Sequence, residues 1–305
     1  QELGDAEAEA FALNSIGFSY ARLGNFEQAF GYHQLAFDIA QNLENLDLIE
    51  TTLVLLGGAN VGLGDYEEAL TKFQQALEIN AQTGDLQDRG SALRSLGLLY
   101  AKQGDHQAAL EHYQEASVIY ESTERLSEQG EVLILRAESY AFLGDYSSSF
   151  VSLDRALAIH QNTENRQGKA ATLASFGLLY ARLGQHQQAL DYYTQALAIQ
   201  EEINDLRGQG SSLNLIAGAY LTLGQVDEAL QYYQQALDMQ QTVGDLSAEA
   251  ATLANLGFLE DVRRNYRAAL DYYQQSITLR RQLGDRSGIG DVFLGMGGVP
   301  KCLGN

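Results

Sequence analysis

The sequence predicts an all-α protein built as a solenoid of stacked helical hairpins, and three observations support this. Residues of one kind recur every 40 positions, most visibly the glycines Gly24, Gly64, Gly104, Gly144, Gly184 and Gly224. Between the glycines, apolar residues follow the spacing of an α-helix. Four of these six glycines are followed by Asn or Asp, residues that favour a helix N-cap, which signals a turn between two helices. A single hairpin cannot bury its apolar face, so the hairpins are expected to stack.

The third repeat illustrates the two helices of each hairpin. The first helix has an apolar face that consists of Leu93, Leu96, Gly97 and Tyr100. After the turn at Gly104, the second helix has a face that consists of Ala109, Leu110, Tyr113, Ala116 and Ile119. We number repeat positions so that Gly24, Gly64 and their counterparts share position 24. The first helix is then expected at about positions 7–22 and the second at about positions 26–42.

This pattern resembles the tetratricopeptide repeat. The family's glycine, tyrosine, alanine, aromatic residue and alanine stand in the third repeat as Gly97, Tyr100, Ala109, Tyr113 and Ala116. The same series returns as Gly17, Tyr20, Ala29, His33 and Ala36, and as Gly177, Tyr180, Ala189, Tyr193 and Ala196. The family's tryptophan and closing proline are absent. The period of 40 is similar to that of kinesin light chains, Pins-type regulators and bacterial multidomain proteins. The resemblance implies a right-handed superhelix whose first helices line the concave side.

We expect seven hairpins followed by a partial helix and a tail. The predicted hairpins are 5–44, 45–84, 85–124, 125–164, 165–204, 205–244 and 245–284. Residues 285–305 begin another first helix, which the glycines and Pro300 should end. This last segment could cap the stack or lead into a continuing chain. Because the chain begins with Gln1 rather than Met, we expect it to be a processed or excised fragment.

Composition narrows the range of partners. The net charge of −21 comes from 40 acidic and 19 basic residues, and an acidic chain repels phosphate backbones, so we expect no nucleic-acid partner. No run of about 18 apolar residues is evident, so we expect no membrane span. The single cysteine, Cys302, excludes an internal disulfide and fits a reducing compartment. We therefore expect a cytoplasmic location.

The stretch KQGDHQAALEHY, residues 102–113, gathers residues that could suggest an active site. Asp105, however, has the position of a helix N-cap. His106 shares its repeat position with His186, 80 residues away, which is too far for both to hold one metal ion. His112 lies six residues from His106, the wrong spacing for one helix face, and we expect it to face outward. We therefore predict no catalytic residue, no metal site and no cofactor, and hence no enzyme.

Two further stretches invite a functional interpretation. The glycine-rich residues 57–64 lack the lysine and hydroxyl residues of a phosphate-binding loop, so we expect a loosened helix end there. The tyrosines Tyr192, Tyr232 and Tyr272 recur beside a packing position on the second helices. They could form a lateral contact surface, or they could be half-buried packing between hairpins.

Partner binding is expected on the first helices, at repeat positions 14, 18 and 22, opposite the core face. Four basic residues and one acidic residue lie there, in a chain with twice as many acids as bases. This bias favours a protein or peptide ligand with acidic and apolar groups, whose backbone the asparagines would fix. Alternatively, the basic residues complement helix dipoles. The predicted contact residues are Asn14, Phe18, Arg22, Arg94, Leu98, Lys102, Leu178, Arg182, Asn214 and Phe258.

The sequence predicts an interaction scaffold and leaves two other functions open. The chain could be the regulatory or sensor arm of a larger multidomain protein, for example beside a caspase-like protease or a signalling domain. It could also be a self-assembling structural module. The seventh repeat argues mildly against endless stacking, because Glu260, Asp261, Arg263 and Arg264 replace the residues of its siblings.

Overall fold

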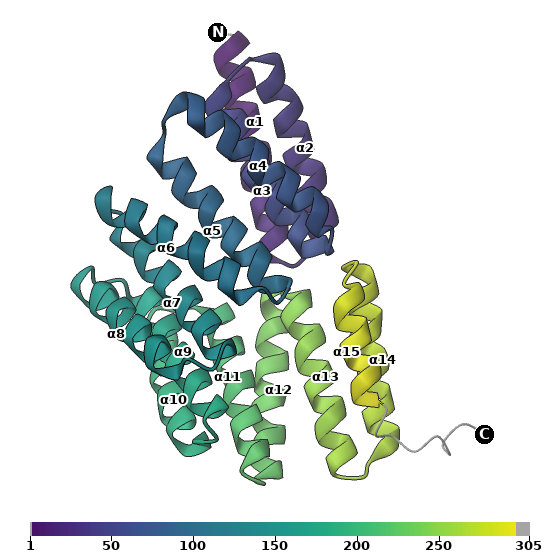
Figure 1. Ribbon diagram of the computed structural model, residues 1–305. Coiled ribbons are helices and arrows are strands. Elements are labelled where there is room, and N and C mark those ends of the chain that lie inside the picture. Colours follow the sequence, from purple (N-terminus) through teal and green to yellow (C-terminus); the bar gives the residue numbers. More distant parts are fainter. Residues whose placement is uncertain (1, 297–305) are drawn as a thin grey trace. The chain divides into compact units, whose positions relative to one another are not determined.

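The computed structural model describes residues 2–296, which form fifteen α-helices and no strand within that range (Figure 1). The chain divides into two compact units, and the boundary between them in the sequence lies between Asn165 and Arg166. Pro300, Cys302 and the rest of the predicted tail, residues 297–305, lie outside the described residues. An all-α array of consecutive helix pairs, as predicted, is what the described residues form.

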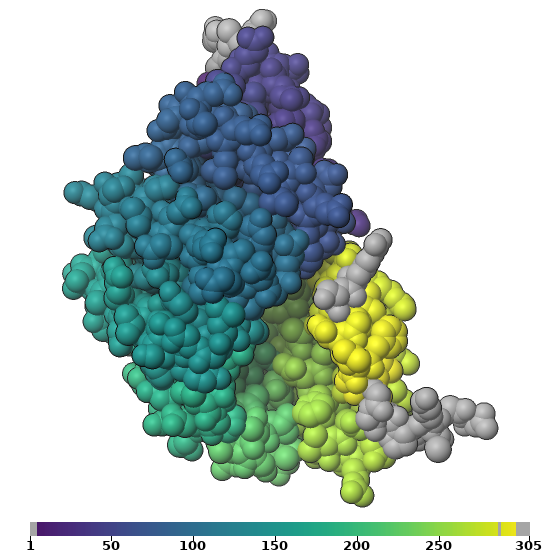
Figure 2. All heavy atoms as spheres, viewed as in Figure 1, coloured from purple at the N-terminus to yellow at the C-terminus, as the bar shows by residue number. Residues whose placement is uncertain are grey.

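The first unit contains four hairpins, each a pair of adjacent helices. Their bounds are α1 (Glu2–Arg22), α2 (Phe26–Asn42), α3 (Leu46–Leu63), α4 (Tyr66–Thr83), α5 (Leu86–Lys102), α6 (His106–Ser122), α7 (Leu126–Phe142) and α8 (Tyr146–Asn162). The space-filling view draws the atoms of this unit in purple, blue and teal (Figure 2).

The second unit contains three hairpins and one further helix. Their bounds are α9 (Arg166–Arg182), α10 (His186–Glu202), α11 (Leu206–Thr222), α12 (Val226–Val243), α13 (Leu246–Val262), α14 (Tyr266–Gln282) and α15 (Arg286–Met296). Apart from α1 and α15, every helix of both units begins and ends within one residue of the predicted repeat positions.

The turns inside the hairpins need a left-handed backbone, which explains the recurring glycine. Gly104 has a φ of 84°, a conformation that costs a residue with a side chain about 1–2 kcal/mol. Arg264 takes the same place in the seventh repeat with a φ of 61°. In three of the seven hairpins the side chain of the following residue caps the second helix, as Asp105 does by accepting a hydrogen bond of 3.0 Å from the backbone of Ala108. The predicted N-cap is therefore confirmed.

Small residues allow the helices of each hairpin to approach closely, as predicted. Gly97 lies against the ring of Tyr113, and any Cβ at Gly97 would collide with that ring. Glycines also lie under rings in α3, where Gly57 faces Phe73 and Gly62 faces Phe26. The expectation of a loosened helix at residues 57–64 is wrong, because α3 continues to Leu63 and ring packing accounts for these glycines.

The rings at repeat positions 20 and 32 stack within the first, third, fifth and sixth hairpins. The ring centroids lie 5.4 Å apart for Tyr20 and Tyr32, 5.3 Å for Tyr100 and His112, and 5.2 Å for Tyr220 and Tyr232. His112 therefore packs against Tyr100, and the expectation that it faces outward is wrong. The tyrosines at position 32 belong to the packing between helices, the second of the two interpretations.

Helix α3 is long and apolar enough, by length and composition alone, to cross a membrane. It is not an unbroken run of apolar residues, because it contains Asp47, Glu50 and Asn60. In the structure α3 packs against α2, α4 and α5, and its side chains Leu48, Leu53 and Leu56 are buried there. Packing in the core of the array accounts for the apolar composition of α3.

Candidate functional site

In each unit the first helices of neighbouring hairpins contact one another directly. The first unit joins α1, α3, α5 and α7 in this way, and the second unit joins α9, α11, α13 and α15. Among the described helices of either unit, second helices of neighbouring hairpins lack comparable contacts. Each unit therefore curves toward its first helices. We call the exposed side of those first helices the inner face of the unit.

The inner face of the first unit exposes large apolar side chains. Phe18 on α1 is 52% exposed and Leu98 on α5 is 39% exposed, both at repeat position 18. Phe11 and Phe142 are also exposed on first helices, although they were not among the predicted contact residues. Phe11 occupies position 11, which periodicity places on the same side. Phe142 stacks on His106 with 4.3 Å between ring centroids, so part of its ring is covered.

Two of the predicted cations of the first unit extend into solvent. Arg22 and Lys102 occupy the last turns of α1 and α5, and both are exposed. No ion pair of either cation occurs among the residues that the structure describes. Each follows an exposed apolar residue by four positions, so Phe18 lies beside Arg22 and Leu98 beside Lys102.

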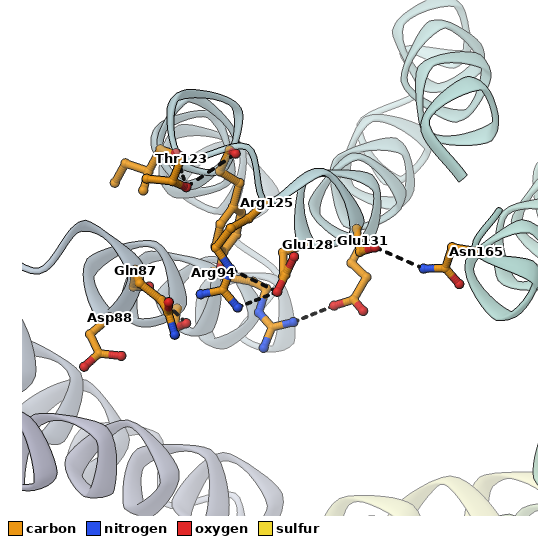
Figure 3. A network of polar contacts seen from close by, with 12 residues as sticks. Gln87, Asp88, Arg94, Thr123, Arg125, Glu128, Glu131 and Asn165 are labelled. Atoms are coloured by element: carbon orange, nitrogen blue, oxygen red, sulfur yellow. Dashed lines mark hydrogen bonds and ion pairs between the residues drawn. The ribbon is translucent and has the colours of Figure 1, made fainter. Parts of the chain in front are cut away.

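The third predicted cation of this unit is already paired. Arg94 reaches from α5 to Glu131 on α7, with 2.8 Å between its Nη1 and the carboxylate (Figure 3). In the same view Arg125 pairs with Glu128 at the start of α7. Burial is the largest single influence on Glu128 and favours its neutral form. The hydrogen bond from Arg125, a backbone hydrogen bond and the charges of Arg125 and Arg94 together outweigh burial and hold the pKa of that carboxyl below its usual value. Arg94 thus joins two hairpins, which reduces the free positive charge of the inner face.

Both predicted asparagines join neighbouring first helices. Asn14 is only 6% exposed, and its amide donates to Thr52 at 2.9 Å while its oxygen lies 3.0 Å from His33 Nδ1. In the second unit, the Asn214 oxygen accepts hydrogen bonds of 3.1 Å from Thr252 and from Asn255. Asn14 has no free amide atom at the surface, and Asn214 can offer a ligand only its amide nitrogen.

The inner face of the second unit is mostly apolar. Leu178 on α9 is 45% exposed and Phe258 on α13 is 51% exposed, and the exposed Arg182 follows Leu178 by four residues. Phe258 borders a cavity of about 280 Å³ between α13, α14 and α15. Tyr273 also lines this cavity. Its buried hydroxyl finds no hydrogen-bond partner among the described residues, and burial raises its pKa to about 12.

Over residues 2–296, no group of three histidine, cysteine or carboxylate side chains is placed to hold a metal ion. The two histidines that drew attention in the sequence are both packed, His106 on Phe142 and His112 on Tyr100. Neither histidine is therefore free to act as the sequence first suggested.

A family model described as tetratricopeptide repeat matches residues 7–82, 48–122, 128–202 and 209–282, and a second model of the same description matches 175–242. The chain is a tetratricopeptide repeat protein. No curated protein matches it.

Solved tetratricopeptide-like structures share this fold at low sequence identity. A Rap protein solved in complex with competence and sporulation factor is 18% identical, with a TM-score of 0.67 over 95% of this chain and 83% of its own. NprR in complex with its cognate peptide NprX is 14% identical, with a TM-score of 0.63 over 90% and 83%. A STAND protein with a tetratricopeptide repeat sensor, from Pyrococcus horikoshii, is 14% identical, with a TM-score of 0.63 over 95% and 44%.

Proposed function

We propose that this tetratricopeptide repeat protein is a scaffold without enzymatic activity that binds a peptide, or a segment of a partner protein, on the inner face of each of its two units. The observation that carries the proposal is a repeated pair, an exposed apolar residue followed one helical turn later by an exposed cation. The pairs are Phe18 with Arg22, Leu98 with Lys102 and Leu178 with Arg182. Apolar anchors beside charges are the features that give peptide grooves both affinity and register.

The chemistry of the pairs indicates the chemistry of the partner. Phe18, Leu98, Leu178 and Phe258 would take apolar side chains, while Arg22, Lys102 and Arg182 would attract carboxylates. Arg94, Asn14 and Asn214 would mainly position the helices that carry these residues, because their side chains bond within the array. The net charge of −21 supports a protein ligand rather than a nucleic acid. A cytoplasmic location is part of the proposal and rests on the single cysteine of the chain.

The solved neighbours support a peptide ligand by analogy of fold. NprR was solved with its cognate peptide, and the Rap protein with competence and sporulation factor. Both likenesses extend over at least 90% of this chain. Because identity is below 20%, the analogy concerns the architecture and not the identity of the ligand.

The proposal can be tested with an array of short acidic and apolar peptides, followed by affinity measurement for the best binder. Leu98→Ala and Lys102→Glu should each weaken binding by about tenfold, as expected for a contact worth more than 1 kcal/mol. The matched control is Arg267→Glu, which changes an exposed arginine on the second helix α14. The control should bind as the unchanged protein does, and the proposal fails if both inner-face variants also bind as tightly as the unchanged protein.

A second candidate function is that of a sensor arm within a larger protein. The specific observation is the fold shared with the STAND protein, whose own chain this protein spans for only 44%. The open reading frame around the coding sequence decides this question. A start codon directly before Gln1 and a stop codon directly after Asn305 would exclude a fused signalling domain.

A further inference from the structure

The fourth hairpin departs from its siblings at two repeat positions that touch each other. Position 16 is apolar elsewhere, as Ile16, Leu56, Leu96, Phe176, Ile216 and Leu256, but it is Arg136 in α7. Position 32 is a ring in five other hairpins, as Tyr32, His112, Tyr192, Tyr232 and Tyr272, and Lys72 in the second, but it is Ser152 in α8. Among the seven hairpins, the fourth therefore combines a cation at position 16 with a small polar residue at position 32.

The fifth hairpin shows what these two positions normally do. Tyr192 at position 32 stacks on Phe176 at position 16, with 5.2 Å between ring centroids, and on Tyr180 at position 20 with the same separation. A ring from the second helix thus covers the first helix. With Ser152 in that place, the fourth hairpin lacks this cover over Arg136 and Tyr140. A hollow of about 170 Å³ remains between α7 and α8, and we call it the α7–α8 notch.

The walls of the notch carry positive charge and hydroxyl groups. Its lining residues are Leu133, Arg136, Tyr140, Ser147, Ser148, Val151, Ser152 and Arg155. The only charged side chains among them are the two arginines. Ser147 and Ser148 also belong to the first turn of α8, whose helix dipole favours an anion, and the Ser148 N–H itself already donates to Asp145. Every charged group of the lining, in a chain of net charge −21, is therefore a cation.

The guanidinium of Arg136 is only partly satisfied by the protein. Its Nη2 makes a long contact of 3.5 Å to the Tyr140 hydroxyl, and its carbon lies 5.9 Å from the centre of the Tyr140 ring. Its Nε is buried and has no hydrogen-bond partner among the described residues. Neither Arg136 nor Arg155 takes part in an ion pair in that part of the chain. A buried N–H group that stays unpaired costs about 1–3 kcal/mol, so an acceptor at this place would be favourable.

Acidic residues lie on the other side of Arg136, toward α6, and they do not pair with it. Glu111, Glu115 and Asp145 line a second hollow there, which Arg136 and Tyr140 also border. Glu115 lies 3.9 Å from Arg89, and Asp145 accepts a hydrogen bond from the Ser148 backbone at 3.1 Å as the cap of α8. None of these carboxylates is among the residues that line the α7–α8 notch.

We propose that the α7–α8 notch binds a phosphate group, either free phosphate or the phosphoryl group of a phosphoserine. Arg136 and Arg155 would donate to its oxygens, since guanidinium groups match oxyanions in a two-pronged geometry. Ser147 would add a hydroxyl donor, and the first turn of α8 favours the charge. Ser152 donates its own hydroxyl to the Ser148 carbonyl at 2.8 Å, so its contribution is its small size. This site is separate from the inner face and does not depend on the peptide proposal.

Titration calorimetry with inorganic phosphate, with a phosphoserine peptide and with acetate tests the proposal. The decisive variant is Ser152→Tyr, which restores the ring that five other hairpins carry and fills the notch. Arg136→Leu restores the residue found at Leu56 and Leu96 and serves if the tyrosine variant does not fold. Both should weaken phosphate binding by at least about tenfold, because charge-assisted hydrogen bonds are lost. The matched control, Arg267→Gln, removes an exposed arginine elsewhere and should leave binding unchanged.

The arms separate the sources of the phosphate group. Binding of the phosphoserine peptide that is tighter than binding of free phosphate supports a protein-borne group, and the reverse order supports a free anion. Acetate should bind at least about tenfold more weakly than either, because it offers fewer acceptor oxygens. The proposal is overturned if the unchanged protein binds no phosphate, if acetate binds equally well, or if folded Ser152→Tyr binds phosphate as the unchanged protein does.

Discussion

Glu50 is a buried carboxyl whose charge should weaken the first unit as the pH rises. It is 0% exposed in α3, its Oε1 has no hydrogen-bond partner among the described residues, and its Oε2 accepts one long bond of 3.4 Å from Thr83. Burial, and next the nearby charge of Asp88, raises its pKa from 4.5 to about 7. The folded protein therefore holds a proton on Glu50 over a pH range in which the unfolded chain releases it.

The size and sign of the effect follow from this difference. Below pH 4.5 both states hold the proton and Glu50 contributes no penalty. Between pH 4.5 and about 7 the unfolded state loses the proton first, so stability falls as the pH rises. Above about pH 7 both states are charged, and the difference of about 2.5 in pKa corresponds to about 3 kcal/mol against folding.

Glu50→Gln should remove this penalty. We expect the variant to exceed the unchanged protein in stability by up to about 3 kcal/mol at pH 8 and by only about 1 kcal/mol at pH 5. The measurement is urea unfolding followed by circular dichroism at several pH values, with hydrogen exchange in α3 to locate the change, because repeat arrays need not unfold in one step. The control is Glu78→Gln, which changes an exposed glutamate on the helix that packs against α3. If the difference between Glu50→Gln and the unchanged protein is the same at pH 5 and pH 8, Glu50 is not the group that titrates.

Three further predictions concern the repeat positions themselves. Gly97→Ala should destabilise by about 1–3 kcal/mol, because its Cβ meets the buried ring of Tyr113, whereas Gly58→Ala, with open space around it, should stabilise by about 0.5–1 kcal/mol in the same unfolding assay. Asp105→Ala should lower the free energy of unfolding by about 1 kcal/mol, and Asp65→Ala should lower it less. Of these two residues, Asp105 accepts a capping hydrogen bond and Asp65 does not, so equal losses of stability would refute the capping role. Burial lowers the pKa of His33 from 6.5 to about 4, so stability should fall as the pH drops through this range, and His33→Tyr should abolish that fall in an acid titration.

The fold was predictable because the same residues solve the same packing problem seven times. Gly97 and Tyr113 have counterparts in other hairpins, so the helix pairs and their turns could be placed from the sequence to within one residue. The continuity of α3 was not predictable in this way. Its glycines Gly57 and Gly62 read as a helix end, and only the rings of Phe73 and Phe26 lying against them show why a helix tolerates them.

The candidate site was less predictable, because side chains can bond across hairpins. Periodicity placed Phe18 and Leu98 on an exposed surface, and the structure exposes both. It could not show that Arg94 pairs with Glu131 some 37 residues later, or that Asn14 bonds to Thr52. These partners lie on neighbouring first helices, and their distance depends on how closely two hairpins pack. Charge counted along one helix therefore overstates the charge that a ligand meets.

Departures from the repeat are where this array is most informative. When one hairpin carries an unusual residue at a repeat position, we ask whether the residue that contacts it is unusual too. Arg136 and Ser152 meet this condition, because the ring that normally covers position 16 is absent where the cation appears. Glu50 lacks such compensation, since its Oε1 stays unpaired among the described residues. The paired change indicates a binding site, and the unpaired one predicts a stability that depends on pH.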